Sequence, residues 1–254
     1  MADAADVLAG IKRVPDLRVV CLVPNHQGAA RALAAGADEI IAICSASESH
    51  NQANLNRSIE ESLQGFGVIV QAAEKAGVVV NAAIAVAFGC PFEGDVAPEH
   101  VADIAARLAT VGVKNITLGD TTGMATPSNV AEVVKKNQER NPDVNLGLHF
   151  HNTRGIGLVN VMAGMSCGIS RFESSIGGLG GCPFAPGASG NICTEDLIYL
   201  MEECGVETGV DLAKLIVCAE HVQELLGREL PGQVMKAGPR TKTFSLESSA
   251  KAVG

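Results

Sequence analysis

The sequence predicts an α/β protein built on one parallel sheet. Short runs rich in β-branched and other apolar residues alternate with longer stretches of helical period, and this alternation occurs six times without a linker. Parallel strands need a helical crossover between them, so such a series favours a continuous parallel sheet. With 254 residues, 47% of them hydrophobic, the chain can form one large domain of this kind.

The expected elements follow one another in a regular order. Strands are expected at residues 18–23, 39–43, 78–87, 115–119, 145–150 and 171–174. Helices are expected at residues 27–37, 57–76, 98–111, 127–140, 155–167, 194–204 and 211–226. We expect residues 1–226 to form one domain that ends in helices. Residues 227–254, rich in Pro, Gly, Ser and Lys, are expected to form a flexible tail.

Six strand–helix units leave two arrangements open. A closed (β/α)8 barrel needs eight such units, whereas an open sheet with helices on both faces needs fewer. In either arrangement the loops that follow the strands meet at one edge of the sheet. Polar residues in those loops are therefore the first candidates for a site.

Composition and charge exclude several classes of protein. The net charge of −9 and the lack of any basic run argue against a nucleic-acid partner. No run of 18 apolar residues is present, and the acidic first ten residues do not resemble a signal peptide, so we expect no membrane association. The eight cysteines form no C-x-x-C pair, which predicts reduced thiols and a cytoplasmic protein.

His149 and His151 form the first candidate site, at the end of the fifth expected strand. Residues i and i+2 of a strand point to the same face, so both imidazoles project the same way. Two converging imidazoles make half of a metal site. The alternative is a pair of histidines that merely occupies a polar strand end.

The loop from Gly177 to Asn191 is the second candidate, with six glycines in fifteen residues. Such a loop lets the backbone approach a ligand or move as a lid. Cys182 lies within it, directly after two glycines, so its thiol is expected to be accessible and is a candidate reactive group. The alternative is a structural turn with an idle thiol.

Further polar groups follow the second, third and fourth expected strands. Asp120 comes directly after the fourth strand, Glu93 lies after the third, and the polar segment 45–58 follows the second. On a parallel barrel all of these positions share the rim where catalytic residues lie. The alternatives are a turn-capping Asp and solvated loops, and we favour a soluble loop for segment 45–58.

These motifs together resemble the 3-hydroxy-3-methylglutaryl-CoA (HMG-CoA) lyase family. The resemblance rests on GGLGGCPFAPGASGN with HFHNTRG before it, and on LGDTTG, AFGCPFEG and SASES…NLNRSIEES in the same order. It covers about Ala5 to Leu226. The loop around Cys182 is its most specific part, because related synthases of the same barrel share the H-x-H pair but lack this cysteine loop. The resemblance implies a TIM-type (β/α)8 barrel.

The resemblance also implies roles for individual residues. It implies a divalent cation, Mg²⁺ or Mn²⁺, bound by His149, His151 and Asn191. It implies His149 or Asp120 as the base and Cys182 as the group that acts on the acetyl-CoA carbon. The residues expected to contact the substrate are Asn54, Ser58, Glu93 and Thr121.

The implied reaction cleaves HMG-CoA to acetoacetate and acetyl-CoA, a step of leucine degradation and ketone-body metabolism. A homodimer is compatible with the family. Two alternatives stay open: a non-catalytic barrel remnant that binds acyl-CoA or a protein partner, and a related aldolase or synthase that acts on another acyl-CoA.

The sequence departs from the family pattern at its start. Family members begin with a strand that carries an Arg-Asp pair before a Gly, and no such pair is found in this sequence. We therefore expect a barrel reduced to about six βα units, without the first two.

Overall fold

The computed structural model describes residues 3–181 and 190–243. The chain divides into two compact units. The sheet unit comprises residues 1–173 and 181–190, and the helical unit comprises residues 174–180 and 191–254. Within the described residues, no helix is long and apolar enough to cross a membrane.

The sheet unit contains the predicted six-stranded parallel sheet. Its strands are β1 (Val20–Val23), β2 (Glu39–Ser45), β3 (Val79–Ala85), β4 (Asn115–Asp120), β5 (Asn145–Phe150) and β6 (Phe172–Glu173). They pair in sequence order, each parallel to the next. A doubly wound sheet reverses its strand order at a switch point, and this sheet does not. The order is that of a barrel, and the strands form a half-barrel.

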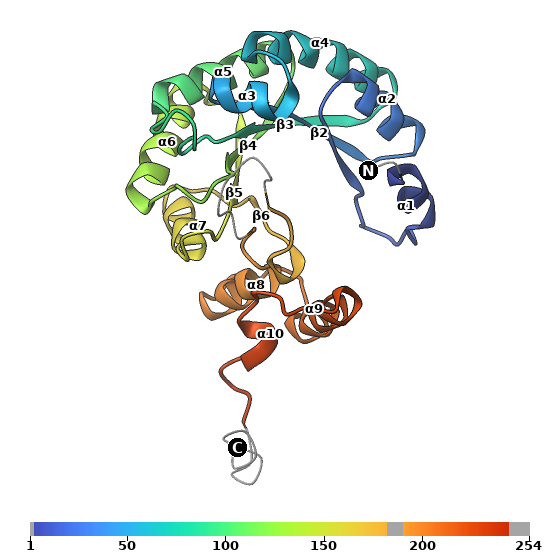
Figure 1. Cartoon of the computed structure of the whole chain (residues 1–254), viewed down its shortest axis with the longest axis vertical. Helices are drawn as coiled ribbons and strands as arrows, with labels where there is room; N and C mark the ends of the chain where they lie inside the picture. The colour runs from blue at the N-terminus through green and yellow to red at the C-terminus, as the bar shows by residue number, and fades with distance from the viewer. Residues whose placement is uncertain (1–2, 182–189, 244–254) are drawn as a thin grey trace. The chain divides into compact units, whose positions relative to one another are not determined.

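The helices that follow the strands cover one side of the sheet. They are α2 (His26–Ala34), α4 (Ile59–Lys75), α5 (Pro98–Thr110), α6 (Pro127–Arg140) and α7 (Gly157–Ser166). Figure 1 shows them in an arc along the outer side of the strands. Large side chains from both helices and strands are fully buried in this unit, among them Phe66 and Leu108 of the helices and Ile116 and Leu148 of the strands. The predicted alternation of strand and helix is thereby confirmed.

Burial differs sharply between the centre and the edge of the sheet. In β4 every residue after Asn115 is buried, which explains its continuous apolar sequence. In β1, at the edge, Val20 and Leu22 remain 42% and 58% exposed. An unpaired parallel edge with exposed apolar side chains is uncommon in native sheets.

In the described part of the sheet unit, two helices were not expected from the sequence. The first is α1 (Ala4–Gly10). The second is α3 (Glu48–Leu55), in the segment for which we favoured a loop. The side chain of Ser47 caps α3 by accepting a hydrogen bond from the amide of His50, and Asn56 ends it in the left-handed conformation. The buried residues of α3 are the polar His50 and Asn51, so the sequence of this helix lacks the apolar periodicity from which a helix is predicted.

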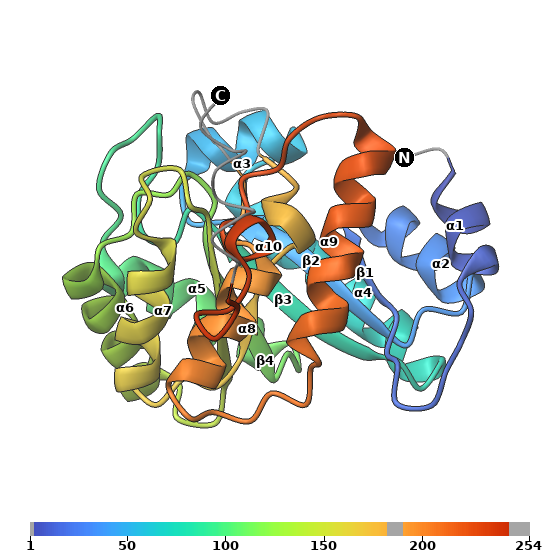
Figure 2. The ribbon, with the colours of Figure 1, turned by 90° about the horizontal axis from the view of Figure 1, so that it is seen from below.

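The helical unit contains the two expected C-terminal helices, α8 (Thr194–Glu203) and α9 (Leu212–Leu226), which pack side by side (Figure 2). A short 3₁₀ turn, η1 (Ile176–Gly178), precedes them in sequence. One more short helix, α10 (Val234–Ala237), lies in the segment expected to be a tail, together with the buried Leu230. Residues 244–254 of that expected tail lie outside the described residues.

Candidate active site

Three neighbouring strands place His149 between Gly119 and Glu173 on one face of the sheet. In the register of the sheet, His149 of β5 is the partner of Gly119 in β4 and of Glu173 in β6. Partners in register point to the same side of a sheet. A Cβ at Gly119 would lie 3.3 Å from the carbonyl oxygen of Ile84, so the strands are closely packed at this position.

Glu173 holds His149 in place. One carboxylate oxygen of Glu173 lies 3.1 Å from Nδ1 of His149, and the other accepts a 2.7 Å hydrogen bond from the hydroxyl of Thr117. Burial opposes ionisation of this carboxyl group, but the hydrogen bonds from His149 and Thr117 outweigh it and keep the pKa of Glu173 below its usual value. Glu173 is therefore a carboxylate at neutral pH.

Glu173 is a site residue that the sequence analysis did not select. The signal was present, because an acidic side chain in the middle of an expected strand (RFES) needs a partner. Only the pairing of β5 with β6 reveals that this partner is His149.

His151 lies beside His149, with 5.3 Å between the ring centroids. Its side chain is buried, and this burial, together with the charge of His149, lowers the pKa of His151 to about 4. The imidazole is therefore neutral at pH 7, and its Nδ1 has no hydrogen-bond partner within the described residues. A neutral imidazole with a free nitrogen is the form that binds a metal ion.

Asp120 ends β4 and is almost fully buried. One oxygen accepts hydrogen bonds from the amides of Met124, at 2.7 Å, and Ala125, at 3.1 Å. Its Oδ2 has no partner among the described residues. Burial raises the pKa of Asp120 to about 6, against the opposing effect of these amides. A carboxyl group that gains and loses a proton near neutral pH is suited to acid–base work.

Two loops of the rim are fastened to each other. Arg154, after β5, donates hydrogen bonds to the carbonyl oxygens of Thr122 and Gly123, at 3.0 and 2.8 Å. Gly123 has φ +62°, and a Cβ there would lie only 2.6 Å from that of Thr153. Glycine is therefore required for this close approach, which keeps the loop of Asp120 against the loop of the histidines.

Thr121 and Glu93 each have a partner at the rim. The hydroxyl of Thr121 accepts a 3.1 Å hydrogen bond from the amide of Val86, whose φ of 51° is strained for a β-branched residue. The carboxylate of Glu93 accepts a 2.6 Å hydrogen bond from the amide of Ser49, at the start of α3. Both residues follow strands of the same sheet, as expected, and their contact with a substrate stays a prediction.

Asn54 lies in α3, and Ser58 follows it at the start of α4. Ser58 caps α4 in the capping box that its spacing to Glu61 predicts. Asn54 is half-buried near the end of α3. The structure thus gives Ser58 a local role in the fold, and the expected substrate contacts of both residues stay predictions.

Asn191 belongs to the helical unit. Its amide nitrogen donates hydrogen bonds to the carbonyl oxygens of Leu179, at 2.7 Å, and Gly180, at 3.3 Å. Its Oδ1 is buried without a partner among the described residues. Gly180 has φ +91°, and a Cβ there would lie 3.0 Å from the amide nitrogen of Asn191. The anchored amide therefore presents a free oxygen, which is suitable for a cation.

The binding of a metal ion by His149, His151 and Asn191 stays a prediction. In the described part of the chain, no group of three or more His, Cys, Asp or Glu side chains could hold an ion. The donors that fit are the two imidazoles and, in the helical unit, the amide oxygen of Asn191. Cys182, the expected catalytic thiol, lies outside the described residues.

A parallel half-barrel with its histidines and buried carboxyl group at the carboxyl ends of the strands defines a class of protein: enzymes of the (β/α)8-barrel type, whose active sites lie at this rim.

The chain belongs to the HMGL-like family, whose model matches residues 2–222. It is 44% identical over 237 residues to the cytoplasmic 3-hydroxy-3-methylglutaryl-CoA lyase of Danio rerio, and the aligned region covers 93% of this chain and 71% of that protein. It is also 45% identical over 222 residues to the (R)-citramalyl-CoA lyase of Chloroflexus aurantiacus, with 87% and 70% covered.

A solved structure agrees with these relatives. The HMG-CoA lyase of Acinetobacter baumannii, in complex with coenzyme A and 3-methylmalate, matches with a TM-score of 0.91 and 44% identity. The match covers 96% of this chain and 80% of that one. The resemblance found in the sequence motifs is thereby confirmed.

Proposed function

We propose that this protein is a carbon–carbon lyase that cleaves HMG-CoA to acetoacetate and acetyl-CoA. The observation that carries the proposal is the group at the ends of β4, β5 and β6, where His149 is held by Glu173 beside the neutral His151, next to the strand that ends in the buried Asp120. Membership of the HMGL-like family supports the same reaction.

The reaction needs one base and one acid. The base removes the proton of the C3 hydroxyl, the C2–C3 bond breaks, and its electron pair moves to C2 as the enolate of acetyl-CoA. The former C3 becomes the ketone of acetoacetate, and C2 then accepts a proton. No redox partner is required, and the atoms balance with no other reactant.

Asp120 is the base that we favour. With its pKa near 6, it is largely ionised at pH 7 and can still accept a proton, and its Oδ2 has no partner among the described residues. His149 is the other candidate. The carboxylate of Glu173 at Nδ1 favours the tautomer with the proton on Nδ1, which leaves Nε2 free to accept a proton or bind a metal.

A divalent cation, Mg²⁺ or Mn²⁺, would be held by His149 and His151, with the Oδ1 of Asn191 as a third ligand. A carboxylate that orients a metal-binding histidine is a common arrangement, and Glu173 is placed for it. When bound, such an ion acts as a Lewis acid that lowers the pKa of a coordinated hydroxyl group.

The remaining expected residues complete the proposal. Cys182 would return the proton to the acetyl-CoA carbon, and its loop would exclude water. The residues proposed to contact the substrate are Asn54, Ser58, Glu93 and Thr121. We further propose that the protein acts in the cytoplasm as a homodimer, in leucine degradation or ketone-body metabolism.

Citramalyl-CoA is a second candidate substrate, because the relative that bears its name is 45% identical to this chain. It has the same tertiary alcohol, with the carboxylate one methylene closer. One methylene changes the selectivity of a pocket by only about 1–3 kcal/mol, so the two compounds must be compared directly.

The test is to incubate the protein with Mg²⁺ and either CoA ester, and to follow acetoacetate, pyruvate and acetyl-CoA by mass spectrometry. Because the chain covers 71% of the Danio rerio relative, a chimera that adds the uncovered part of that protein is assayed in parallel. Acetoacetate formation with a higher kcat/KM than pyruvate formation supports the proposal. A higher kcat/KM for citramalyl-CoA transfers the assignment to the second substrate. If both folded proteins are inert on both esters, the lyase proposal is wrong.

A further inference from the structure

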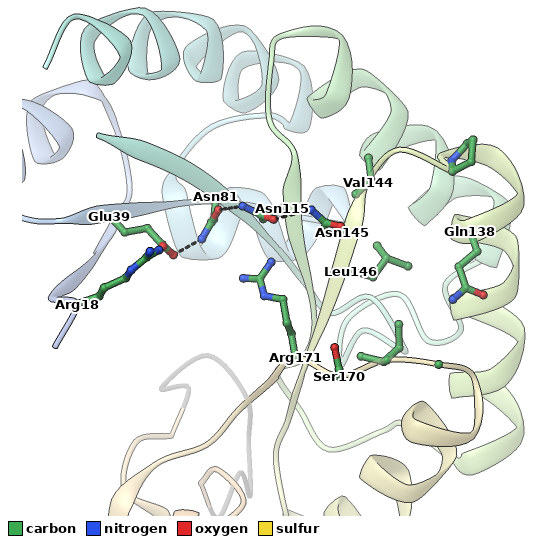
Figure 3. Close-up of a pocket in the computed structure, with 13 residues that line it drawn as sticks. Arg18, Glu39, Asn81, Asn115, Gln138, Val144, Asn145, Leu146, Ser170 and Arg171 are labelled. Atoms are coloured by element: carbon green, nitrogen blue, oxygen red, sulfur yellow. Dashed lines mark hydrogen bonds between the residues drawn. The ribbon is translucent and has the colours of Figure 1, made fainter. Parts of the chain in front are cut away.

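The amino ends of the strands form a polar pocket of about 510 Å³, at the opposite end of the sheet from the candidate active site. Glu39, Asn115 and Asn145, the first residues of β2, β4 and β5, lie in its lining. Figure 3 shows these side chains together with Asn81 and Arg171. All of the lining residues belong to the sheet unit.

One wall of the pocket is a row of side chains joined by hydrogen bonds. Asn145 donates to the Oδ1 of Asn115 at 3.2 Å, and Asn115 donates to the Oδ1 of Asn81 at 2.8 Å. Asn81 in turn donates to the carboxylate of Glu39. Because every amide donates in the same direction along the row, the orientation of each amide is fixed, and the carboxylate of Glu39 already has a partner.

Arg171 is the exception in this satisfied surface. Its side chain extends toward Asn81 and Asn115 in Figure 3. The Nη1 atom is buried and has no hydrogen-bond partner within the described residues. A buried guanidinium nitrogen without an acceptor is rare in native proteins and needs an explanation. Arg18 also lines the pocket, so a second guanidinium group adds to its positive charge.

We propose that this pocket binds a small anion with carboxylate or phosphate oxygens, and that Arg171 is its principal contact. The planar guanidinium group offers paired N–H donors that match the oxygens of either anion. The asparagine row supplies a rigid polar wall. The volume lies within the range of sites for small molecules. The site lies at the other end of the sheet from the lyase chemistry. Because the charge of Arg171 also helps to lower the pKa of Glu173, anion binding rather than turnover is the readout that tests this proposal.

The test is calorimetric titration of the whole protein with succinate and, separately, with inorganic phosphate, at constant ionic strength and with EDTA present. Two variants probe the pocket. Arg171→Met removes the guanidinium group, and Ser170→Asp adds a carboxylate to the lining from an exposed position. Arg31→Met, which removes an exposed arginine of α2, is the matched control. Circular dichroism verifies that each variant is folded.

We expect saturable binding of one anion per chain, weakened about tenfold or more by Arg171→Met and by Ser170→Asp, and unchanged by Arg31→Met. Tighter binding of succinate identifies a carboxylate ligand, and tighter binding of phosphate identifies a phosphate-bearing one; both support the proposal. The absence of saturable binding of either anion to the folded protein contradicts it. Equal affinity in the wild type and in Arg171→Met does so as well.

Discussion

The two ends of the parallel sheet treat polar side chains in different ways. At the carboxyl end, single atoms of buried groups lack a hydrogen-bond partner among the residues that the structure describes, as at Oδ2 of Asp120 and Nδ1 of His151. At the amino end, three asparagines and Glu39 satisfy one another in a row, with Arg171 as the exception. Unsatisfied buried polar atoms cost stability, so they are expected where chemistry or binding uses them. The comparison supports our proposal of catalysis at the carboxyl end, and it is consistent with a rigid wall at the amino end.

The largest expected effect is the loss of turnover on replacing Asp120 by Asn. A general base contributes about two to four orders of magnitude to the rate, and the amide cannot accept the proton. Steady-state kinetics with HMG-CoA measure the loss in kcat. Asp103→Asn, on the exposed surface of α5, is the control and should keep the wild-type rate. An active Asp120→Asn enzyme would move the role of base to His149.

The same replacement should change how stability depends on pH. The pKa of Asp120 is about 6 in the folded protein and 3.8 in the reference state, so ionising it in the fold costs about 3 kcal/mol. The folded state is therefore stabilised by the protonated form of Asp120. This stabilisation is fully present below pH 4 and is lost as the pH rises through 6. Relative to the wild type, Asp120→Asn should therefore gain up to about 3 kcal/mol between pH 4 and pH 8. Urea unfolding in EDTA measures it, and a constant difference across that range contradicts the burial of a charged Asp120.

A smaller effect is expected for Glu173→Gln. Loss of a carboxylate that orients a metal-binding histidine lowers metal affinity or activity by about 10- to 100-fold. The amide can still accept the hydrogen bond from Thr117, so the fold should persist. Mn²⁺ binding followed by electron paramagnetic resonance, together with kcat, measures the change. An unaltered Mn²⁺ affinity would mean that Glu173 does not act through His149.

The smallest expected effect is a difference in unfolding free energy between a variant in the middle of the asparagine row and a variant at its end. Asn81 is buried and bonded on both sides, so Asn81→Ala removes a partner from two half-buried groups, the amide of Asn115 and the carboxylate of Glu39. This loss should cost about 1 kcal/mol of unfolding free energy. Asn145 is exposed and bonded to one neighbour in the row, so Asn145→Ala should cost less. Thermal unfolding compares the two variants. Equal costs would show that the row does not act as a rigid wall.

The sequence predicts the strands better than it predicts the contacts between them. The alternation of apolar runs and helical periods predicts all six strands, because burial on both faces of strands such as β4 leaves a clear signal. The pair of His149 and His151 was found because the two residues are two positions apart at the end of one expected strand. Glu173 was not found, because its role depends on the register between β5 and β6, which no local pattern encodes. The helix α3 was missed for a related reason, since polar bonds rather than an apolar face hold it.

The most direct test of the account is turnover of HMG-CoA by His149→Ala and by His221→Ala, each made in the 254-residue chain and in the chimera with the Danio rerio relative. His221 lies exposed on α9, in the helical unit, and serves as the matched histidine control. The account predicts that acetoacetate formation falls by two orders of magnitude or more in His149→Ala and is unchanged in His221→Ala. If His149→Ala retains the wild-type rate, the carboxyl end of the sheet is not where the chemistry takes place.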